Sequence, residues 1–343
     1  MNSPSAGIPR LSAVGPAPNA VPDIDEIRAL VDEHMNAVDN RIHESLRSDV
    51  ALVNDISGYI VNSGGKRLRP MLVLLSAEAM GYQGRSHIDL AAIIEFIHTA
   101  TLLHDDVVDA SALRRGKDTA NAIWGNEASV LVGDFLYSRA FQMMVQVGSM
   151  RVMEIMAETT NVIAEGEVLQ LLNCHDPETT EQRYLEVIRS KTAKLFEAGS
   201  MVGAVLAARS TRDERAMAAY GLHLGTAYQL VDDMLDYCGA ADHIGKNVGD
   251  DLAEGKPTLP LIHGIRNGSP SEAELIKTAI REGDLSLIEQ VVDVVESTGG
   301  IAYTARAARL EVDRALEALA DVPGSRFKQG LQHLAEFAVS RTY

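Results

Sequence analysis

Apolar residues recur at helical spacing along most of the chain. Residues 89–109 contain no Gly and no Pro, and their Ala, Leu and Ile side chains follow the repeat of a buried helix. Residues 24–62 are expected to form two helices, and 213–237 one or two. Further helical stretches are predicted at 71–80, 127–146, 151–172, after Thr180 and along 259–343. Because long alternations typical of β-strands are few, the pattern predicts an all-α fold.

The charge of the chain argues against one class of partner. With 31 Lys and Arg against 48 Asp and Glu, the net charge is -17 over 343 residues, so a nucleic-acid backbone would be repelled. An anionic substrate is compatible with this charge only where basic residues cluster and divalent cations bind. Cys174 and Cys238 have no metal-ligand spacing and fit a reducing compartment. No run of 18 or more apolar residues occurs, so no membrane span is expected.

The beginning of the chain differs from the rest. Residues 1–22 are rich in Pro, Ala, Ser and Gly and lack the basic start and apolar core of a signal peptide, so they are predicted to be a disordered tail. An amphipathic transit peptide is the alternative, and the single basic residue, Arg10, counts against it. Residues 23–343 are expected to form one large helical domain.

The predicted helix 89–109 ends in three carboxylates, Asp105, Asp106 and Asp109. Residues four apart are neighbours on a helix, so Asp105 and Asp109 share a face. Like charges this close repel each other unless a cation lies among them. Oxygen ligands suit a hard ion, and Mg²⁺ is typically held by one or two carboxylates together with substrate phosphates.

The same DDxxD pattern returns once, at Asp232, Asp233 and Asp236, again towards the end of an apolar helical run. One copy alone could equally be a solvated helix end. Two copies favour a paired site for metal ions and a diphosphate. Gln229 lies three residues before Asp232 and four before Asp233, and is therefore expected to face the same site.

A basic loop precedes the helical stretch 71–80. Gly64 and Gly65 are followed by three cations within four residues, Lys66, Arg67 and Arg69, and then by Pro70. Pro is tolerated in the first turn of a helix, and a helix N-terminus favours a bound anion. A solvated basic turn is the alternative. In a chain this acidic, the concentrated basic loop favours a diphosphate site.

Other candidates lie near the carboxylates in sequence. His98 precedes Asp105 by two helical turns on the same face. A lone helical His is more often a core residue, and the shared face makes the functional and the core interpretations about equal. Arg114 and Arg115 follow the helix end on an expected loop, and Arg matches phosphate oxygens in a bidentate fork.

Four further residues are weaker candidates. Lys191 and Thr192 lie within an expected helix, and taken alone this pair is unremarkable. Lys246 and Lys256 lie in a long polar, Gly-rich loop, and loops of this length inside compact domains are often functional.

Taken together, these motifs are similar to those of trans-isoprenyl (polyprenyl) diphosphate synthases, over about residues 24–343. The segments HTATLLHDDVVD and GKNVGDDLAEGKPTLPL most resemble those of bacterial octaprenyl diphosphate synthases. The resemblance implies a helical bundle of the isoprenoid synthase type around a central cavity, usually a homodimer. It also implies Mg²⁺ as cofactor, a cytoplasmic location and at most peripheral contact with a membrane on product release.

The resemblance assigns roles residue by residue. It gives catalytic roles to Asp105, Asp106, Asp109, Arg114, Lys191, Asp232, Asp233 and Asp236, with Mg²⁺ bound directly by Asp105, Asp109 and Asp232. It assigns the allylic diphosphate to Arg114, Lys191, Thr192 and Gln229, with Lys246 and Lys256 nearby. It assigns isopentenyl diphosphate to Lys66, Arg69, His98 and Arg115, with Arg67 adjacent.

The implied reaction joins farnesyl diphosphate to successive isopentenyl diphosphates, giving an octaprenyl or nonaprenyl chain for the ubiquinone side chain. The length of the product is expected to depend on which side chains block an apolar tunnel below the carboxylates. Ala100 and Thr101, five and four residues before Asp105, are small, so the tunnel is expected to stay open there. Met144 and Met156 are the hypothesised deeper floor.

Three rival interpretations remain at this point. A farnesyl or geranylgeranyl diphosphate synthase would be expected to carry larger residues than Ala100 and Thr101. A terpene cyclase would not need the basic loop for a second diphosphate. A non-catalytic subunit of a heteromeric synthase would be expected to lose part of the carboxylate set, and this chain keeps both copies.

Overall fold

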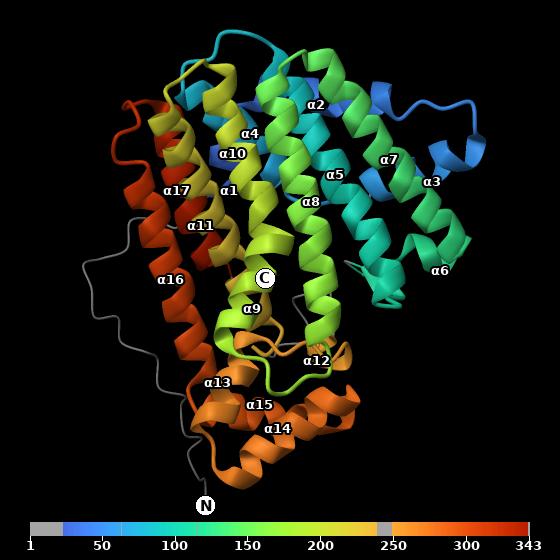
Figure 1. Cartoon of the computed structure of the whole chain (residues 1–343), viewed down its shortest axis with the longest axis vertical. Helices are drawn as coiled ribbons and strands as arrows, with labels where there is room; N and C mark the ends of the chain where they lie inside the picture. Colours follow the sequence, from blue (N-terminus) through green and yellow to red (C-terminus); the bar gives the residue numbers. More distant parts are fainter. Residues whose placement is uncertain (1–22, 63, 115, 239–248, 342–343) are drawn as a thin grey trace, which may run out of the picture.

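The computed structural model describes residues 23–62, 64–114, 116–238 and 249–341 (Figure 1). The predicted tail, residues 1–22, lies outside these ranges, as do Arg115 and Lys246. In the first half, the elements are α1 (Ile24–Ala29), α2 (Asp32–Ser45), α3 (Ala51–Val61), α4 (Leu68–Ala79), α5 (Ser86–Val108), β1 (Leu113–Arg114), β2 (Lys117–Asp118), α6 (Ala120–Trp124), α7 (Asn126–Val147) and α8 (Met150–Asn173).

The elements of the second half, in its described part, are all helices. Its elements are α9 (Glu181–Ile188), the π-helix η1 (Arg189–Ala193), α10 (Lys194–Leu206), α11 (Thr211–Leu235), α12 (Asp250–Ala253), α13 (Leu259–Asn267), α14 (Pro270–Glu282), the 3₁₀-helix η2 (Leu285–Leu287), α15 (Ile288–Ser297), α16 (Gly300–Ala318) and α17 (Arg326–Ser340). The predicted all-α fold is confirmed. In the described ranges, the only strands are β1 and β2, which have two residues each and pair as an antiparallel hairpin.

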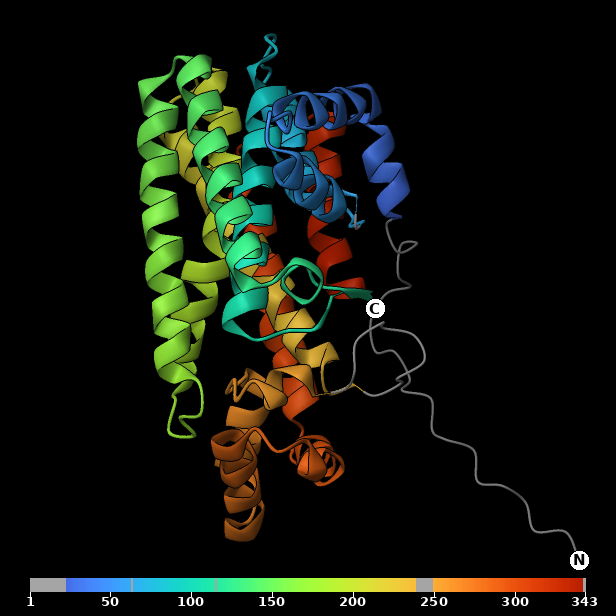
Figure 2. The same ribbon diagram turned by 90° about the vertical axis from the view of Figure 1, so that its right-hand side faces the viewer.

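The long helices form a bundle around α5. Helix α5 packs against α7, α4 and α2, while α11 packs against α10 and α16. Figure 1 shows these helices side by side, and Figures 1 and 2 agree in placing α13, α14 and α15 beyond one end of the bundle. Most of the buried apolar side chains form one cluster that runs through the bundle, and a smaller cluster lies among α12 to α15.

Helix boundaries follow local chemistry. Ser210 caps α11 and forms a capping box with Asp213. The stretch predicted as one or two helices is therefore the single helix α11. Thr180 caps α9 as expected, because its hydroxyl accepts the Arg183 N–H.

One expectation from the sequence is wrong. Residues 24–62 form three helices rather than two, because the chain leaves helical geometry at Val31, where φ is -130°. Ile27 of α1 and Met35 of α2, on either side of the break, are both buried, at 1% and 0% exposed.

By length and composition, α5 would be apolar enough to cross a membrane. However, 72% of its most apolar window is buried inside the bundle. A helix covered on all sides needs an apolar surface all round, which explains the composition of α5 without a membrane.

Candidate active site

The end of α5 presents its carboxylates in two directions. The Asp105 carboxylate lies 3.3 Å from the Lys191 ammonium, and Asp109 lies 3.0 Å from that of Lys256. Asp106 is fully buried and turns the other way, to the Arg114 guanidinium at 2.6 Å. The negative end of the helix dipole adds to this charge, so the helix end requires cations.

Lys191 is held by an unusual helical turn. It lies in the π-helix η1, a wide turn that is frequent at functional sites. Its ammonium lies 2.5 Å from a carboxylate oxygen of Glu167 on α8, in addition to Asp105. Burial lowers the pKa of Lys191, but Asp105 and Glu167 raise it by more, so Lys191 stays charged. Burial, together with Asp105, raises the pKa of Glu167.

The second carboxylate cluster is anchored by hydrogen bonds. Asp233 is 4% exposed and accepts hydrogen bonds from the Tyr184 hydroxyl at 2.5 Å and the Gln229 amide at 2.7 Å. The Thr192 hydroxyl donates to Gln229 at 3.0 Å. Burial, then the charge of Asp251, raises the pKa of Asp233. The chain of bonds from Thr192 to Asp233 ties η1 to α11.

The other two aspartates of this cluster have different partners. Asp232 forms an ion pair with Arg341 at 2.7 Å, and the Arg341 guanidinium also lies 3.5 Å from the centre of the Tyr228 ring. Asp236 accepts a hydrogen bond from the backbone N–H of Asp251 at 3.1 Å.

The basic residues of the segment 66–69 lie just before and at the start of α4. Arg69, in the first turn of α4, donates to His98 at 3.0 Å, which brings this segment to the middle of α5. Arg67 has a positive φ of 49° and is held by the Glu95 carboxylate and by the Val61 carbonyl at 2.8 Å. Burial and the Arg341 guanidinium lower the pKa of Lys66. Arg67 is therefore tied to the protein itself, whereas Lys66 lies near the C-terminal arginine.

Two cavities adjoin the end of α5. The first, about 450 Å³, is lined by residues that include Lys66, Arg67, Arg69, His98, Asp106 and Arg114. The second, about 190 Å³, is lined by residues that include Asp105, Asp109, Arg114, Lys191, Thr192, Gln229, Asp233 and Lys256. Arg114 therefore lines both. Among the residues lining the second cavity in the described ranges, Asp233 is present, and Asp232 and Asp236 are not.

The residues expected to limit chain length lie outside both linings. Ala100 is fully buried on α5, and the Thr101 hydroxyl donates to the His98 carbonyl at 2.8 Å. Met144 and Met156 are 1% and 0% exposed and belong to the main apolar core. Their role as a tunnel floor stays a prediction.

Several residues of the site carry no motif that the sequence could reveal. Glu167 contacts Lys191, Tyr184 contacts Asp233 and Glu254 contacts Lys256. Arg341 lies far in sequence from Lys66, whose pKa it lowers. The partners of Glu167 and Tyr184 are distant in the chain, and Glu254 lies only two residues from Lys256 but is not among the residues that the sequence predicted.

The donor chemistry fits a hard divalent cation. The candidate ligands are carboxylates alone, which suits Mg²⁺ or Ca²⁺ rather than a softer metal. In the described part of the chain, the Oδ2 atom of Asp106 and the Oε1 atom of Glu167 are buried without a hydrogen-bond partner. Buried carboxylate oxygens are costly without a partner, so a nearby cation would stabilise them.

Comparisons with known proteins agree with this architecture. Residues 50–296 match the family model described as polyprenyl synthetase. The octaprenyl diphosphate synthase of Escherichia coli is 52% identical over 320 residues, which are 93% of this chain and 99% of that protein. An all-trans-nonaprenyl-diphosphate synthase (geranyl-diphosphate specific) of Rhodobacter capsulatus is 46% identical over 92% of this chain and 97% of that protein.

Solved structures give the same result. A polyprenyl synthase from Caulobacter crescentus, complexed with calcium and isoprenyl diphosphate, has a TM-score of 0.91 and 45% identity, covering 95% of this chain and all of that one. The chain belongs to the polyprenyl synthetase family. Within it, the chain is a trans-prenyltransferase of the long-chain, all-trans polyprenyl diphosphate synthase class.

Proposed function

We propose that this enzyme makes octaprenyl diphosphate by adding isopentenyl diphosphate units to farnesyl diphosphate. The observation that supports this most directly is the pair of cavities that meet at Arg114, each lined by cations suited to a diphosphate. A chain-elongating synthase needs two such sites side by side, one for the growing allylic chain and one for the incoming unit. The 52% identity to an octaprenyl diphosphate synthase supports the product length.

The two cavities receive different substrates in this proposal. The allylic diphosphate binds in the smaller cavity, where Lys191, Thr192, Gln229 and Lys256 lie with Arg114. Isopentenyl diphosphate binds in the larger cavity, where Lys66, Arg69 and His98 lie with Arg67 at its wall. Arg115 and Lys246 keep the substrate roles proposed from the sequence, and both lie outside the described residues.

Mg²⁺ is the proposed cofactor, held by Asp105, Asp109 and Asp232, with Asp106, Asp233 and Asp236 as supporting carboxylates. When bound, such ions neutralise the charge that develops on a departing diphosphate. Asp232 is paired with Arg341, so its role as a ligand requires that this ion pair open.

The protein side chains contribute to each part of the reaction. Lys191, Lys256 and Arg114 are placed to stabilise negative charge as the allylic C–O bond breaks, and their positions are set before the reaction by ion pairs and packing. Lys66, Arg69 and His98 orient isopentenyl diphosphate so that its double bond attacks C1 of the allylic unit. The proton then lost from C2 passes to the departed diphosphate, so no protein base is needed, and the double bond itself is the nucleophile.

The proposal also covers the oligomeric state of the enzyme, the extent of its catalytic domain and its location in the cell. Large apolar side chains are exposed along α7 and α8, among them Leu131, Val168, Leu171 and Leu172 at 66%, 58%, 61% and 67%. A run of this kind is typical of a surface covered by another subunit, which supports a homodimer. Residues 23–343 act as one catalytic domain in the cytoplasm, with at most peripheral membrane contact, and the product supplies the ubiquinone side chain.

Product length tests the proposal. The purified chain is incubated with Mg²⁺, farnesyl diphosphate and labelled isopentenyl diphosphate, and the dephosphorylated products are sized by chromatography. We expect octaprenol as the longest major product, and loss of incorporation when a chelator removes the metal. Nonaprenol would move the assignment to the nonaprenyl enzymes, and a stop at farnesol or geranylgeraniol would contradict the long-chain proposal.

A further inference from the structure

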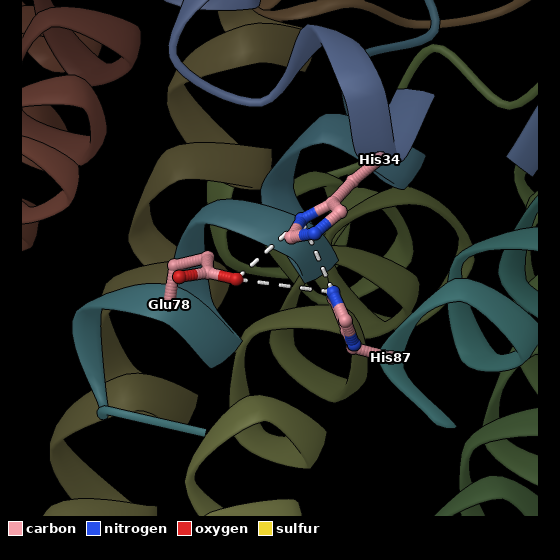
Figure 3. A group of neighbouring side chains, drawn as sticks. All are labelled: His34, Glu78 and His87. Carbon is pink, nitrogen blue, oxygen red and sulfur yellow. Dashed lines mark hydrogen bonds and ion pairs between the residues drawn. The ribbon is translucent and has the colours of Figure 1, made fainter. Parts of the chain in front are cut away.

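Three side chains from three helices meet at the other end of the bundle (Figure 3). They are His34 on α2, Glu78 near the end of α4 and His87 near the start of α5. His87 and Asp105 are 18 residues apart on α5, and at 1.5 Å per residue this places the group roughly 27 Å from the carboxylates. The cluster is therefore separate from the diphosphate site.

The ligand atoms of the cluster converge on one point. The distance from Nδ1 of His34 to Nε2 of His87 is 3.2 Å, and a single oxygen of Glu78, Oε1, lies 3.4 Å from the first atom and 3.9 Å from the second. Figure 3 shows all three atoms directed at the space between them. A tetrahedral metal with bonds of about 2.0–2.1 Å separates its ligand atoms by roughly 3.4 Å, which these distances bracket.

His87 is the most buried member of the cluster. Its side chain is 2% exposed, and its Nε2 atom is the one that faces His34 and Glu78. The ring is packed edge-on against His34 and Tyr82.

The donor set selects the kind of ion. Two imidazole nitrogens and one carboxylate oxygen suit Zn²⁺ and its transition-metal neighbours, whereas Mg²⁺ and Ca²⁺ prefer oxygen alone. Exposure falls from His34 at 36% through Glu78 at 19% to His87 at 2%, so the site is open to solvent on the side of His34. A fourth ligand from water would enter there.

We propose that His34, Glu78 and His87 bind one Zn²⁺ ion, with water as the fourth ligand. The ion joins α2 to α4 and α5 and so fastens the N-terminal helices to the bundle. It takes no part in diphosphate chemistry. Because metal binding to a folded site stabilises the folded state, Zn²⁺ raises the Tm of the protein.

The test uses the full chain, freed of metal by a chelator and then kept in excess Mg²⁺ to occupy the diphosphate site. Zn²⁺ is titrated in competition with a chromophoric indicator, and Co²⁺ absorption reports a tetrahedral site. The variants are His34→Gln and Glu78→Gln, whose side chains are partly exposed, because His87→Ala empties a buried position. The control is His43→Gln, an exposed histidine on the same helix α2 whose ring contacts only the Asp39 carbonyl among the contacts described.

We expect wild type and His43→Gln to bind one Zn²⁺, to show the tetrahedral Co²⁺ spectrum and to gain Tm with Zn²⁺. The affinity of His34→Gln and Glu78→Gln is expected to fall at least tenfold, with the Tm gain lost. Equal Zn²⁺ affinity in all four proteins, or no Zn²⁺ binding in excess Mg²⁺, would overturn the proposal. These measurements do not involve turnover, so the outcome is independent of the proposed prenyl transfer.

Discussion

Neighbouring aspartates at the end of α5 differ in what surrounds them. Asp106 is fully buried and its charge is matched by Arg114, so its main effect is to position that arginine between the two cavities. Asp105 lines the smaller cavity and shares Lys191 with Glu167. Asp105 and Asp106 are adjacent in sequence, but the helical repeat points them in different directions. Asp106 therefore positions Arg114, whereas Asp105 faces the proposed substrate.

Replacing Asp105 should show this directly. In Asp105→Asn the shape is kept but the charge is lost, so a proposed metal ligand and a partner of Lys191 are removed together. We expect the rate of isopentenyl incorporation to fall by about 10²-fold or more, with helical circular dichroism unchanged. Asp134→Asn is the control, because Asp134 is 63% exposed on α7 and pairs with His104. Equal rates for the two variants would contradict the role of Asp105.

A second residue, Glu311 on α16, links distant helices by charge. Its buried carboxylate lies 2.5 Å from His223 on α11, 2.7 Å from Arg314 and 3.4 Å from Arg189 of η1. Burial raises the pKa of Glu311, but the hydrogen bond and charge of His223, then the two arginines, lower it by more.

The pH dependence of stability follows from this lowered pKa. The stabilisation is fully present above the ordinary carboxyl value of 4.5 and is lost as pH falls through the lower pKa of the folded state. We expect Glu311→Gln to lower the free energy of unfolding by about 3 kcal/mol at neutral pH. The gap between variant and wild type should narrow below pH 4.5 in urea unfolding curves. A gap that stays constant down to low pH would contradict this account.

At the scale of elements, the site depends on the π-helix η1 that carries Lys191 and Thr192. Two other helices press closely on this turn at glycines. A Cβ at Gly166 of α8 would lie 2.8 Å from the Lys191 backbone N, and one at Gly225 of α11 would lie 2.7 Å from the Ala193 Cα. These neighbours are backbone atoms, which cannot move aside as a flexible side chain can, so the glycines set where Lys191 lies.

A methyl group at Gly166 should therefore displace the turn. We expect Gly166→Ala to lose about 1–3 kcal/mol of stability through overpacking and to lower activity as Lys191 moves. Gly58→Ala on α3 is the matched control, because a Cβ there meets nothing within 4 Å, and Ala in a helix is favoured over Gly by about 0.5–1 kcal/mol. Denaturant unfolding and prenyl-transfer rates measure both effects. Wild-type rates in Gly166→Ala would show that η1 tolerates a shift.

At the scale of the molecule, the apolar surface along α7 and α8 has consequences for assembly. Leu172, 67% exposed on α8, lies among the exposed residues that support the proposed homodimer. A charge buried in an apolar interface is costly, so we expect Leu172→Glu to shift the protein to monomer in sedimentation velocity. Leu310→Glu is the control, because Leu310 is 51% exposed on α16, away from α7 and α8. Loss of dimer in both variants, or in neither, would contradict this interface.

Product length is also a property of the whole bundle, because the chain must grow between helices. We expect Met144→Ala on α7 and Met156→Ala on α8 each to lengthen the longest product, since both remove bulk from the apolar core. Each should also cost about 2–5 kcal/mol of stability. Met35→Ala on α2, at an equally buried position, should cost similar stability without changing product length. Unchanged products in both variants would remove these methionines as the floor.

Much of the fold could be predicted from sequence. The spacing of apolar residues is a local property of a helix, so α5 and α8 follow from it, and Thr180 is a local N-cap signal for the start of α9. The break at Val31 could not be predicted, because Ile27, Val31 and Met35 keep the spacing of one continuous helical face. The π-helix likewise has no local signature, and residues 189–193 were expected to be an ordinary helix.

The sequence by itself determined the chemistry of this protein: two carboxylate clusters, the cations that accompany them and the helices that carry them. These features are encoded within single turns of helix, where neighbours in sequence are neighbours in space. Only the tertiary structure decided which aspartate faces which cavity, how Glu167, Tyr184 and Arg341 enter the site, and that His34, Glu78 and His87 meet. Such contacts join residues far apart in the chain, and helix packing rather than local periodicity brings them together.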